Sequence, residues 1–204
     1  MRQLPDRSRP QIDSTRRTPI GSGTYHTVRS GQPLSLVTIR AAAGQRSRGW
    51  LTAEGHAIPV ALGRGGIQAN KREGDGATPR GIFFPVRLWW RADRHPRSAS
   101  LLPVRAVTAE DAWCEDASSR HYNQPIRLDA HQGGDRLWRD DHLYDFLIEI
   151  DHNTKPRIAG RGSAVFLHLA REGFSPTAGC VAMTKPAMLR LLKRLAPETK
   201  IVIG

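Results

Sequence analysis

The sequence predicts a mostly β fold, a sandwich or partly closed barrel, with one C-terminal amphipathic helix packed on it. Short apolar segments recur along the chain, and residues that favour turns separate them at the spacing of β-hairpins. One segment near the C-terminus shows the periodicity of an amphipathic helix. Many short strands with a single clear helix are typical of sandwiches and barrels.

The chain is long enough for one domain preceded by an arm. Residues 1–30 contain six arginines and two aspartates among Ser, Thr, Pro and Gly, so we expect a basic flexible N-terminal arm. Residues 31–204 are expected to form the folded domain. The net charge of +12 attracts polyanions such as nucleic acid, anionic lipid or acidic wall polymers, but it selects none of them.

The first strands of the domain are predicted from alternation and turn residues. Residues 34–40 alternate apolar and polar side chains, which is the pattern of a half-buried strand. Residues 49–54 and 57–62 flank Gly55-His56, a dipeptide typical of a tight turn, so they are predicted to form a hairpin. Residues 82–90 are predicted to form a further single strand.

A long loop at residues 63–81 is rich in Gly, Asp, Asn, Thr and Pro. It lacks the Gly-Lys-Ser/Thr ending of a phosphate-binding loop and precedes a strand, which disfavours phosphate binding. We therefore expect this loop to form a wall or rim of a cleft. The irregular section at residues 91–141 is predicted to be a packed insertion that lines a groove.

The second half of the domain contains two buried strands and the helix. Residues 144–150 and 163–169 are predicted strands, and the second of them delivers His168. Thr184 is a suitable N-cap and Pro186 fits a first helical turn. The apolar helical face that follows consists of Met188, Leu189, Leu191, Leu192 and Leu195. Pro197 is expected to stop the helix, and residues 199–203 form a last strand.

Composition excludes several other classes of protein and site. Cys114 and Cys180 are too few for a disulfide framework or a four-thiolate metal site. A metal site built from Asp140, Asp141, His142, His121 and His152 is disfavoured, because no His-x-x-x-His spacing occurs and arginines lie beside them. No apolar run is long enough to span a bilayer, and no apolar segment follows Arg16-Arg17, so no signal peptide is visible.

Cys180 and His168 are the candidate reactive pair. A thiol acts as a strong nucleophile when a neighbour takes its proton, and histidine suits that role at neutral pH. Gly179 permits close approach of a substrate carbonyl, and backbone N–H groups around Gly179 and Cys180 could bind the oxyanion. The alternative interpretation is that Cys180 is a small core residue. In that case the basic chain would be a non-catalytic binding module for anionic wall polymer or nucleic acid.

These residues resemble the L,D-transpeptidase catalytic domain (YkuD) family, in a proteobacterial branch. The resemblance rests on His168, the loop and Cys motif at residues 176–181, the following helix and strand, and residues 74–84. Trp113 to Asp116 and Tyr122-Asn123 also match, and the resemblance covers residues 34–204. It implies a YkuD-like fold in which Cys180 is the nucleophile, His168 the base, Gly179 part of the oxyanion site and Thr177 part of the pocket.

The family's pattern differs from this sequence at two positions. Ala178 stands where the family often has His, and Ala182 stands where it often has Arg or Asn. Arg161 or Arg171 is a candidate for supplying the missing positive group and binding substrate.

The resemblance implies a cysteine L,D-transpeptidase that acts on peptidoglycan stem peptides through a thioester acyl-enzyme. The acyl group would pass to a neighbouring stem, forming a cross-link, or to another amine. A hydrolase of L,D-carboxypeptidase or amidase type on the same fold is the alternative, because it would use the same nucleophile. The resemblance implies no metal or other cofactor, no nucleic-acid partner, and a location in the periplasm or cell wall.

Overall fold

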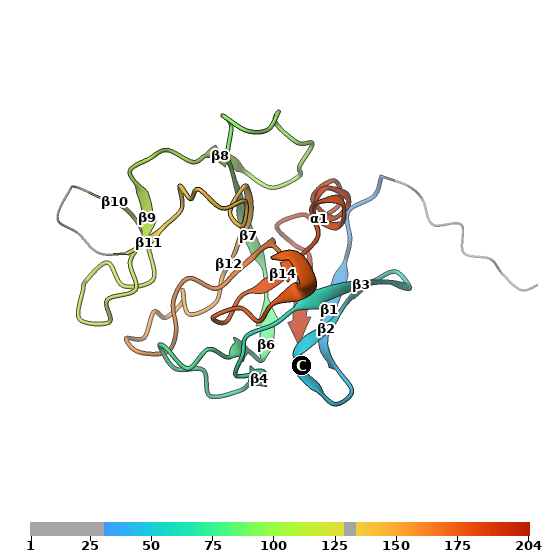
Figure 1. Cartoon of the computed structure of the whole chain (residues 1–204), viewed down its shortest axis with the longest axis horizontal. Helices are drawn as coiled ribbons and strands as arrows, with labels where there is room; N and C mark the ends of the chain where they lie inside the picture. Colours follow the sequence, from blue (N-terminus) through green and yellow to red (C-terminus); the bar gives the residue numbers. More distant parts are fainter. Residues whose placement is uncertain (1–30, 129–133) are drawn as a thin grey trace, which may run out of the picture.

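The computed structural model describes residues 31–128 and 134–204 (Figure 1). The predicted arm at residues 1–30 lies outside the described residues. Within them, the chain is mostly β, as predicted, and ten strands form one large sheet. Its order is β6 (Gly81–Phe83), β15 (Lys200–Ile203), β1 (Leu36–Ala42), β2 (Gln45–Ala53), β3 (His56–Ala61), β14 (Val181–Met183), β13 (Phe166–Leu169), β12 (Phe146–Ile150), β7 (Pro85–Trp90) and β8 (Val104–Ala106).

The sheet curls because β6 and β7 are separated by only one residue, Phe84. β6 is at one edge of the sheet, paired with β15, whereas β7 is near the other end, paired with β12. Two distant positions of the sheet order must therefore lie side by side, which gives a partly closed barrel. The backbone N–H of Phe84 donates to Asp151 Oδ1 (2.7 Å), and the N–H of Asp151 donates to the Phe84 carbonyl (3.0 Å). The single strand predicted at residues 82–90 is thus wrong.

The β2–β3 hairpin is confirmed, but its turn lies one residue earlier than predicted. Ala53 pairs with His56, so the central turn residues are Glu54 and Gly55. Their φ angles are 46° and 79°. Positive φ at both central residues defines the hairpin turn that matches the twist of the strands, which explains why the glycine occupies the second position.

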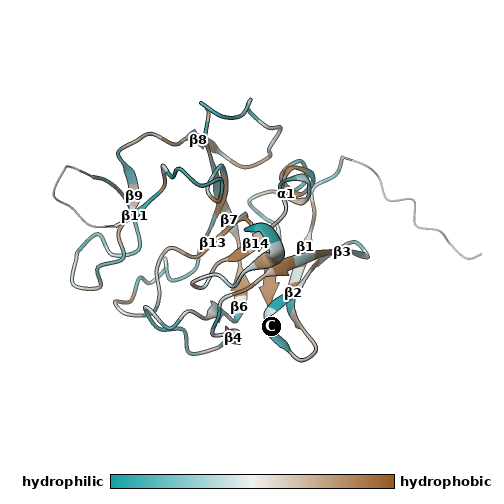
Figure 2. Cartoon of the chain, in the orientation of Figure 1, coloured by the Kyte–Doolittle hydropathy of each residue, from teal (hydrophilic) through white to brown (hydrophobic). Residues whose placement is uncertain are grey.

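The main core fills the space between the curled sheet and α1 (Lys185–Leu192). The helix lies against the brown, hydrophobic strands in Figure 2. Buried side chains from both sides meet there, among them Val37, Ile39, Leu51, Leu167, Met183 and Met188. The helix ends at Leu192, before Pro197, and Leu195 is buried beyond its end, which corrects the predicted extent.

A second, smaller sheet stands beside the large one. It has the order β10 (Pro125–Arg127), β9 (Asp111–Trp113) and β11 (Asp135–Arg136), at the left of Figure 1. The section predicted as an irregular insertion therefore contains β8 and these three strands. Trp113 packs edge-on against Phe166 of β13, with ring centroids 5.0 Å apart, so the small sheet covers the outer side of β13.

The remaining elements are short. β4 (Ile67–Gln68) and β5 (Thr78–Pro79) pair within the long loop, and a 3₁₀ turn, η1, spans Glu172–Phe174. In residues 31–128 and 134–204 the longest helix, α1, has 8 residues, and none meets the length and hydropathy of a bilayer-spanning segment.

Candidate active site

Two neighbouring strands position Cys180 and His168. β13 and β14 run parallel, with Leu167 opposite Val181 and His168 opposite Ala182. Cys180 directly precedes β14, two residues before Ala182, and alternate residues of a strand point to the same face. The side chains of Cys180 and His168 are therefore directed to one face of the sheet, and both line a cavity of about 260 Å³.

Cys180 is buried, with 7% of its surface exposed. Its thiol donates to the carbonyl of Ala164 (3.2 Å), and its sulfur accepts from the N–H of Phe166 (3.4 Å). Burial raises the pKa of the thiol to about 12, so the resting group is a neutral thiol. Ala164 has a φ of 50°, a left-handed conformation that side chains with a Cβ adopt at some cost. The strained residue thus carries the carbonyl that accepts the hydrogen bond from the thiol.

His168 is buried to a similar degree, with 6% exposed. Its Nδ1 lies 2.8 Å from the carbonyl of Leu169, and a carbonyl can only accept, so Nδ1 carries the hydrogen and Nε2 the lone pair. Burial lowers the pKa of the imidazole to about 4, so it is neutral near pH 7. The Tyr144 ring packs edge-on against it, 5.3 Å between centroids. The pair rests as a neutral thiol and a neutral base.

The loop before Cys180 is held by Thr177 and Gly179. Thr177 Oγ1 donates to the Cys180 carbonyl (2.7 Å) and accepts from the Gly179 N–H (3.1 Å). A Cβ at Gly179, where φ is 147°, would lie 2.9 Å from the Ala77 carbonyl oxygen, so only glycine fits. Because the Gly179 N–H is engaged within the loop, the N–H of Cys180 is the better candidate for binding an oxyanion.

A second cavity, of about 360 Å³, meets the first at Cys180. Arg64, Lys71, Glu73 and Gly74 of the long loop line it, which confirms the prediction that this loop walls a cleft. The residues that line both cavities are Glu115, Asp135, Tyr144, Ala178 and Cys180. The thiol therefore lies where two spaces join, one on the His168 side and one on the side of the long loop.

The long loop is braced by its own polar contacts. Lys71 is buried and pairs with Asp75, although it lines the cavity. Glu73 accepts hydrogen bonds from the Tyr122 hydroxyl and from Ser163 Oγ (2.7 Å). These contacts tie the loop to the segment that leads into β13, so the wall of the second cavity is fixed to the strand that carries His168.

Sequence reasoning missed two acidic residues of the site. Asp135 accepts a hydrogen bond from the Tyr144 hydroxyl (2.7 Å), and burial raises its pKa. Glu115 is exposed at the rim of the cavities. Its pKa is nevertheless raised to about 7, because the side that faces the cavity loses hydration and because Asp135 and Glu73 are negatively charged. The sequence offered one signal for these two residues: both lie within residues 91–141, the section that was expected to line a groove.

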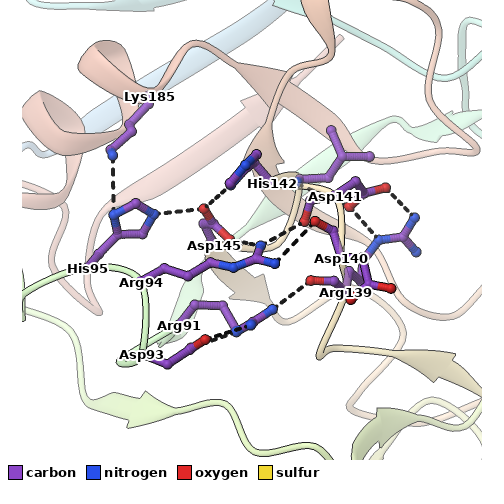
Figure 3. A network of polar contacts seen from close by, with 11 residues as sticks. Arg91, Asp93, Arg94, His95, Arg139, Asp140, Asp141, His142, Asp145 and Lys185 are labelled. Atoms are coloured by element: carbon purple, nitrogen blue, oxygen red, sulfur yellow. Dashed lines mark hydrogen bonds and ion pairs between the residues drawn. The ribbon is translucent and has the colours of Figure 1, made fainter.

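A polar network centred on Asp145 supports the wall that carries Tyr144 (Figure 3). The Asp145 side chain, 2% exposed, accepts from Arg94 Nη1 (2.8 Å) and contacts His95 Nε2 (2.7 Å) and His142 Nδ1 (2.8 Å). Asp141, considered above as a metal ligand, instead pairs with Arg139 (2.7 Å). No group of three metal-ligating side chains converges within the residues that the structure describes.

The two candidate arginines differ in position. Arg171 lines the His168-side cavity and lies 3.8 Å from Asp141. Arg161 is not among the residues that line either cavity at Cys180, and its backbone carbonyl lies 3.1 Å from His152 Nε2. Of these two arginines, Arg171 alone lines a cavity at the thiol.

The family model of the L,D-transpeptidase catalytic domain (YkuD) matches residues 37–203 of this chain. Among curated proteins, none matches. Among solved structures, Bd1075 of Bdellovibrio bacteriovorus is similar, with 15% identity and a TM-score of 0.40. The likeness covers 84% of this chain and 48% of that one, so this chain spans about half the length of Bd1075.

Proposed function

This chain belongs to the L,D-transpeptidase catalytic domain (YkuD) family, and we propose that it is a cysteine L,D-transpeptidase that acts on peptidoglycan stem peptides. The observation that supports the proposal is the shared cavity of Cys180 and His168, which lie on one face of two adjacent parallel strands. A nucleophile and a base that face the same cavity are the minimum for acyl transfer through a covalent intermediate.

In the first half-reaction, Cys180 attacks the amide between the L-centre of a diamino acid and a terminal D-Ala. Nε2 of His168 takes the thiol proton as the C–S bond forms, because both groups are neutral at rest. The N–H of Cys180 binds the oxyanion of the tetrahedral intermediate. The C–N bond then breaks, His168 returns the proton to the departing amine, and a thioester remains.

In the second half-reaction, an amine of a neighbouring stem attacks the thioester. The C–N bond forms, His168 takes a proton from the attacking nitrogen, and the C–S bond breaks to restore the thiol. Water in place of the amine gives carboxypeptidase activity. The leaving and arriving amines both exchange a proton with His168, so we assign them to the His168-side cavity and the acyl group to the cavity beside the long loop.

Arg171 is the residue that we assign to the carboxylate of the group in the His168-side cavity. It lines that cavity and is mostly exposed, so it is free to reorient toward a ligand. Since peptidoglycan lies outside the cytoplasmic membrane, the proposed substrate assigns the protein to the periplasm or the cell wall.

The test is product analysis with a stem tetrapeptide that ends in D-Ala, with and without a D-amino acid acceptor. Mass spectrometry should show D-Ala release and an exchanged peptide with the wild type. Cys180→Ala should form neither product, whereas Cys114→Ala, which removes the other buried thiol, should form both. Turnover by Cys180→Ala, or no turnover by the wild type, would overturn the proposal. Hydrolysis without exchange would identify the hydrolase of the same fold instead.

A further inference from the structure

The Glu115 carboxylate stands where the two cavities meet at the thiol. It lines both cavities, as do Asp135 and Cys180. The small sheet explains this placement: Asp135 of β11 pairs with Trp113 of β9, and Glu115 follows two residues after Trp113. Two acidic side chains from separate segments are thereby brought to the side of the cleft that faces the nucleophile.

The two acids differ in how they are held. Asp135 accepts from the Tyr144 hydroxyl and lies 3.6 Å from Arg139, so its oxygens are engaged. Among residues 31–128 and 134–204, Glu115 has no hydrogen-bond or ion-pair partner, and it is exposed at the rim. Asp135 therefore supplies a fixed negative charge, while Glu115 has a carboxylate that is available to a ligand.

A second observation points to a ligand in the same place. His168 is 94% buried and lines the His168-side cavity, and its Nδ1 donates a hydrogen bond to the carbonyl of Leu169. In the described part of the chain, Nε2 has no hydrogen-bond partner. This ring nitrogen has a lone pair and no partner, and its side chain lines a cavity that Glu115 also lines. His168 and Glu115 can each accept a proton, so a cavity that both line suits a ligand that must lose two protons during the reaction.

An amine acceptor has that property, because it is an ammonium ion at neutral pH. The ammonium nitrogen has no lone pair, so one proton must leave before attack, and a second must leave after the new C–N bond forms. His168 can serve only one of these transfers while the thioester is in place. The other transfer needs a separate base near the same carbon atom.

We propose, on the basis of the function proposed above, that Glu115 binds the acceptor as an ammonium ion and takes the first proton from it. The ammonium and the Glu115 carboxylate become a neutral amine and a neutral acid. The amine then attacks the thioester carbonyl, and its second proton passes to Nε2 of His168. The C–S bond breaks, the thiolate recovers that proton from His168, and Glu115 releases its proton to water.

The surroundings of Glu115 suit this role. Asp135 and Glu73 add negative charge that attracts a cation, and they favour the protonated form that Glu115 must adopt during the reaction. A base whose pKa lies near the working pH is the most effective at such a transfer. Lys71 and Arg139 are paired with Asp75 and Asp141, so Arg64 and Arg171 are the cavity-lining cations that we assign to the carboxylates of the same substrate.

The test compares two nucleophiles on a preformed acyl-enzyme of the Glu115→Gln variant. A D-amino acid arrives as an ammonium ion, whereas hydroxylamine is largely uncharged at neutral pH and needs no prior deprotonation. Transfer to the D-amino acid should be at least 10-fold slower than in the wild type, a modest part of the roughly 100-fold or more that general bases contribute. Transfer to hydroxylamine should stay within about 2-fold of the wild type. Acylation by a donor that ends in D-Ala should slow about as much as transfer to the D-amino acid, because departure of D-Ala is the reverse of attack by an ammonium acceptor.

The matched control is Asp116→Asn, which removes a negative charge from the neighbouring exposed residue outside both cavities. It should behave as the wild type with both nucleophiles. An equal loss with both nucleophiles, or no loss with the D-amino acid, would overturn the role of Glu115. Absence of any acyl-enzyme in the wild type would instead overturn the proposed function on which this role rests.

Discussion

His168 stands directly opposite Ala182 in the parallel register of β13 and β14. Ala182 is buried, with 1% of its surface exposed, and lines the cavity that Cys180 and His168 share. A methyl group at this position leaves room beside the imidazole, on the face of the sheet where the thiol lies.

Filling that space should block acylation. Ala182→Leu is expected to slow acyl-enzyme formation at least 10-fold, because three added carbon atoms occupy the cavity beside His168. Its stability should fall by about 1 to 3 kcal/mol, the usual cost of overpacking a core. Stopped assays of acylation and urea denaturation measure the two effects.

Ala187→Leu is the control, because Ala187 is also 1% exposed but lies on α1 in the main core. It should lose similar stability and keep its acylation rate. If Ala182→Leu acylates as fast as Ala187→Leu, the cavity beside His168 is not where the substrate reacts.

Gly179→Ala should disrupt the loop that presents the thiol. The added Cβ would meet the Ala77 carbonyl 2.9 Å away, so the backbone must move. Activity should fall by about 100-fold, because displacement of reacting groups by roughly 1 Å has that order of effect. Gly55→Ala is the control: its φ is also positive, but nothing lies within 4 Å of its Cβ. It should cost about 1 kcal/mol of stability and no activity. Near-normal activity of Gly179→Ala would contradict the tight fit.

Arg171 and Arg161 provide a matched pair of exposed arginines. Arg171→Gln should raise the KM for a D-amino acid acceptor several-fold with little change in kcat, because it removes a contact made to bound substrate throughout the reaction. Arg161→Gln should leave KM unchanged, since Arg161 lines neither cavity at the thiol. Equal effects of the two substitutions on KM would mean that general surface charge, and not position in the cavity, attracts the substrate.

His168 should make the protein less stable in acid. Its pKa falls to about 4 in the folded state, whereas the unfolded chain binds a proton below about pH 6.5. The unfolded state therefore holds more protons between these values, and stability is lost as the pH falls through this window. The loss from this group between pH 7.5 and 4.5 is roughly 2 to 3 kcal/mol.

Urea denaturation at the two pH values checks this expectation. The change in unfolding free energy should be smaller by that amount in His168→Gln than in the wild type. His121→Gln, at an exposed position, is the matched control for loss of an imidazole. An identical pH dependence in His168→Gln and the wild type would contradict a neutral, buried His168.

Patterns of apolar and turn-forming residues in the sequence were sufficient to predict the strands and the helix that depend on local contacts. Alternation predicts β1 and the helical period predicts α1, because each pattern reflects one buried face. The turn dipeptide Gly55-His56 predicts the hairpin. The break at Phe84 could not be predicted, since residues 82–90 are uniformly suited to a strand. What separates β6 from β7 is the choice of partners, β15 and β12, which are far away in sequence.

The site shows the same division. Cys180 and His168 stand at the ends of apolar segments that sequence can identify, but Glu115 and Asp135 lie in a section without periodicity. Only the pairing of β9 with β11 brings the two acids together in the lining of the cavities at the thiol. Proximity in sequence also failed to separate Arg171 from Arg161, because only the folded chain shows that Arg171 lines a cavity at the thiol and Arg161 does not.

Mass spectrometry of the intact protein after a short incubation with the stem tetrapeptide tests whether Cys180 is the nucleophile. We expect a single adduct with the mass of the donor minus D-Ala, mapped to Cys180. His168→Gln should form this adduct roughly 100-fold more slowly or worse, as expected for loss of a general base. An adduct on another residue, or one that forms equally well in Cys180→Ala, would contradict the assignment of Cys180 as the nucleophile.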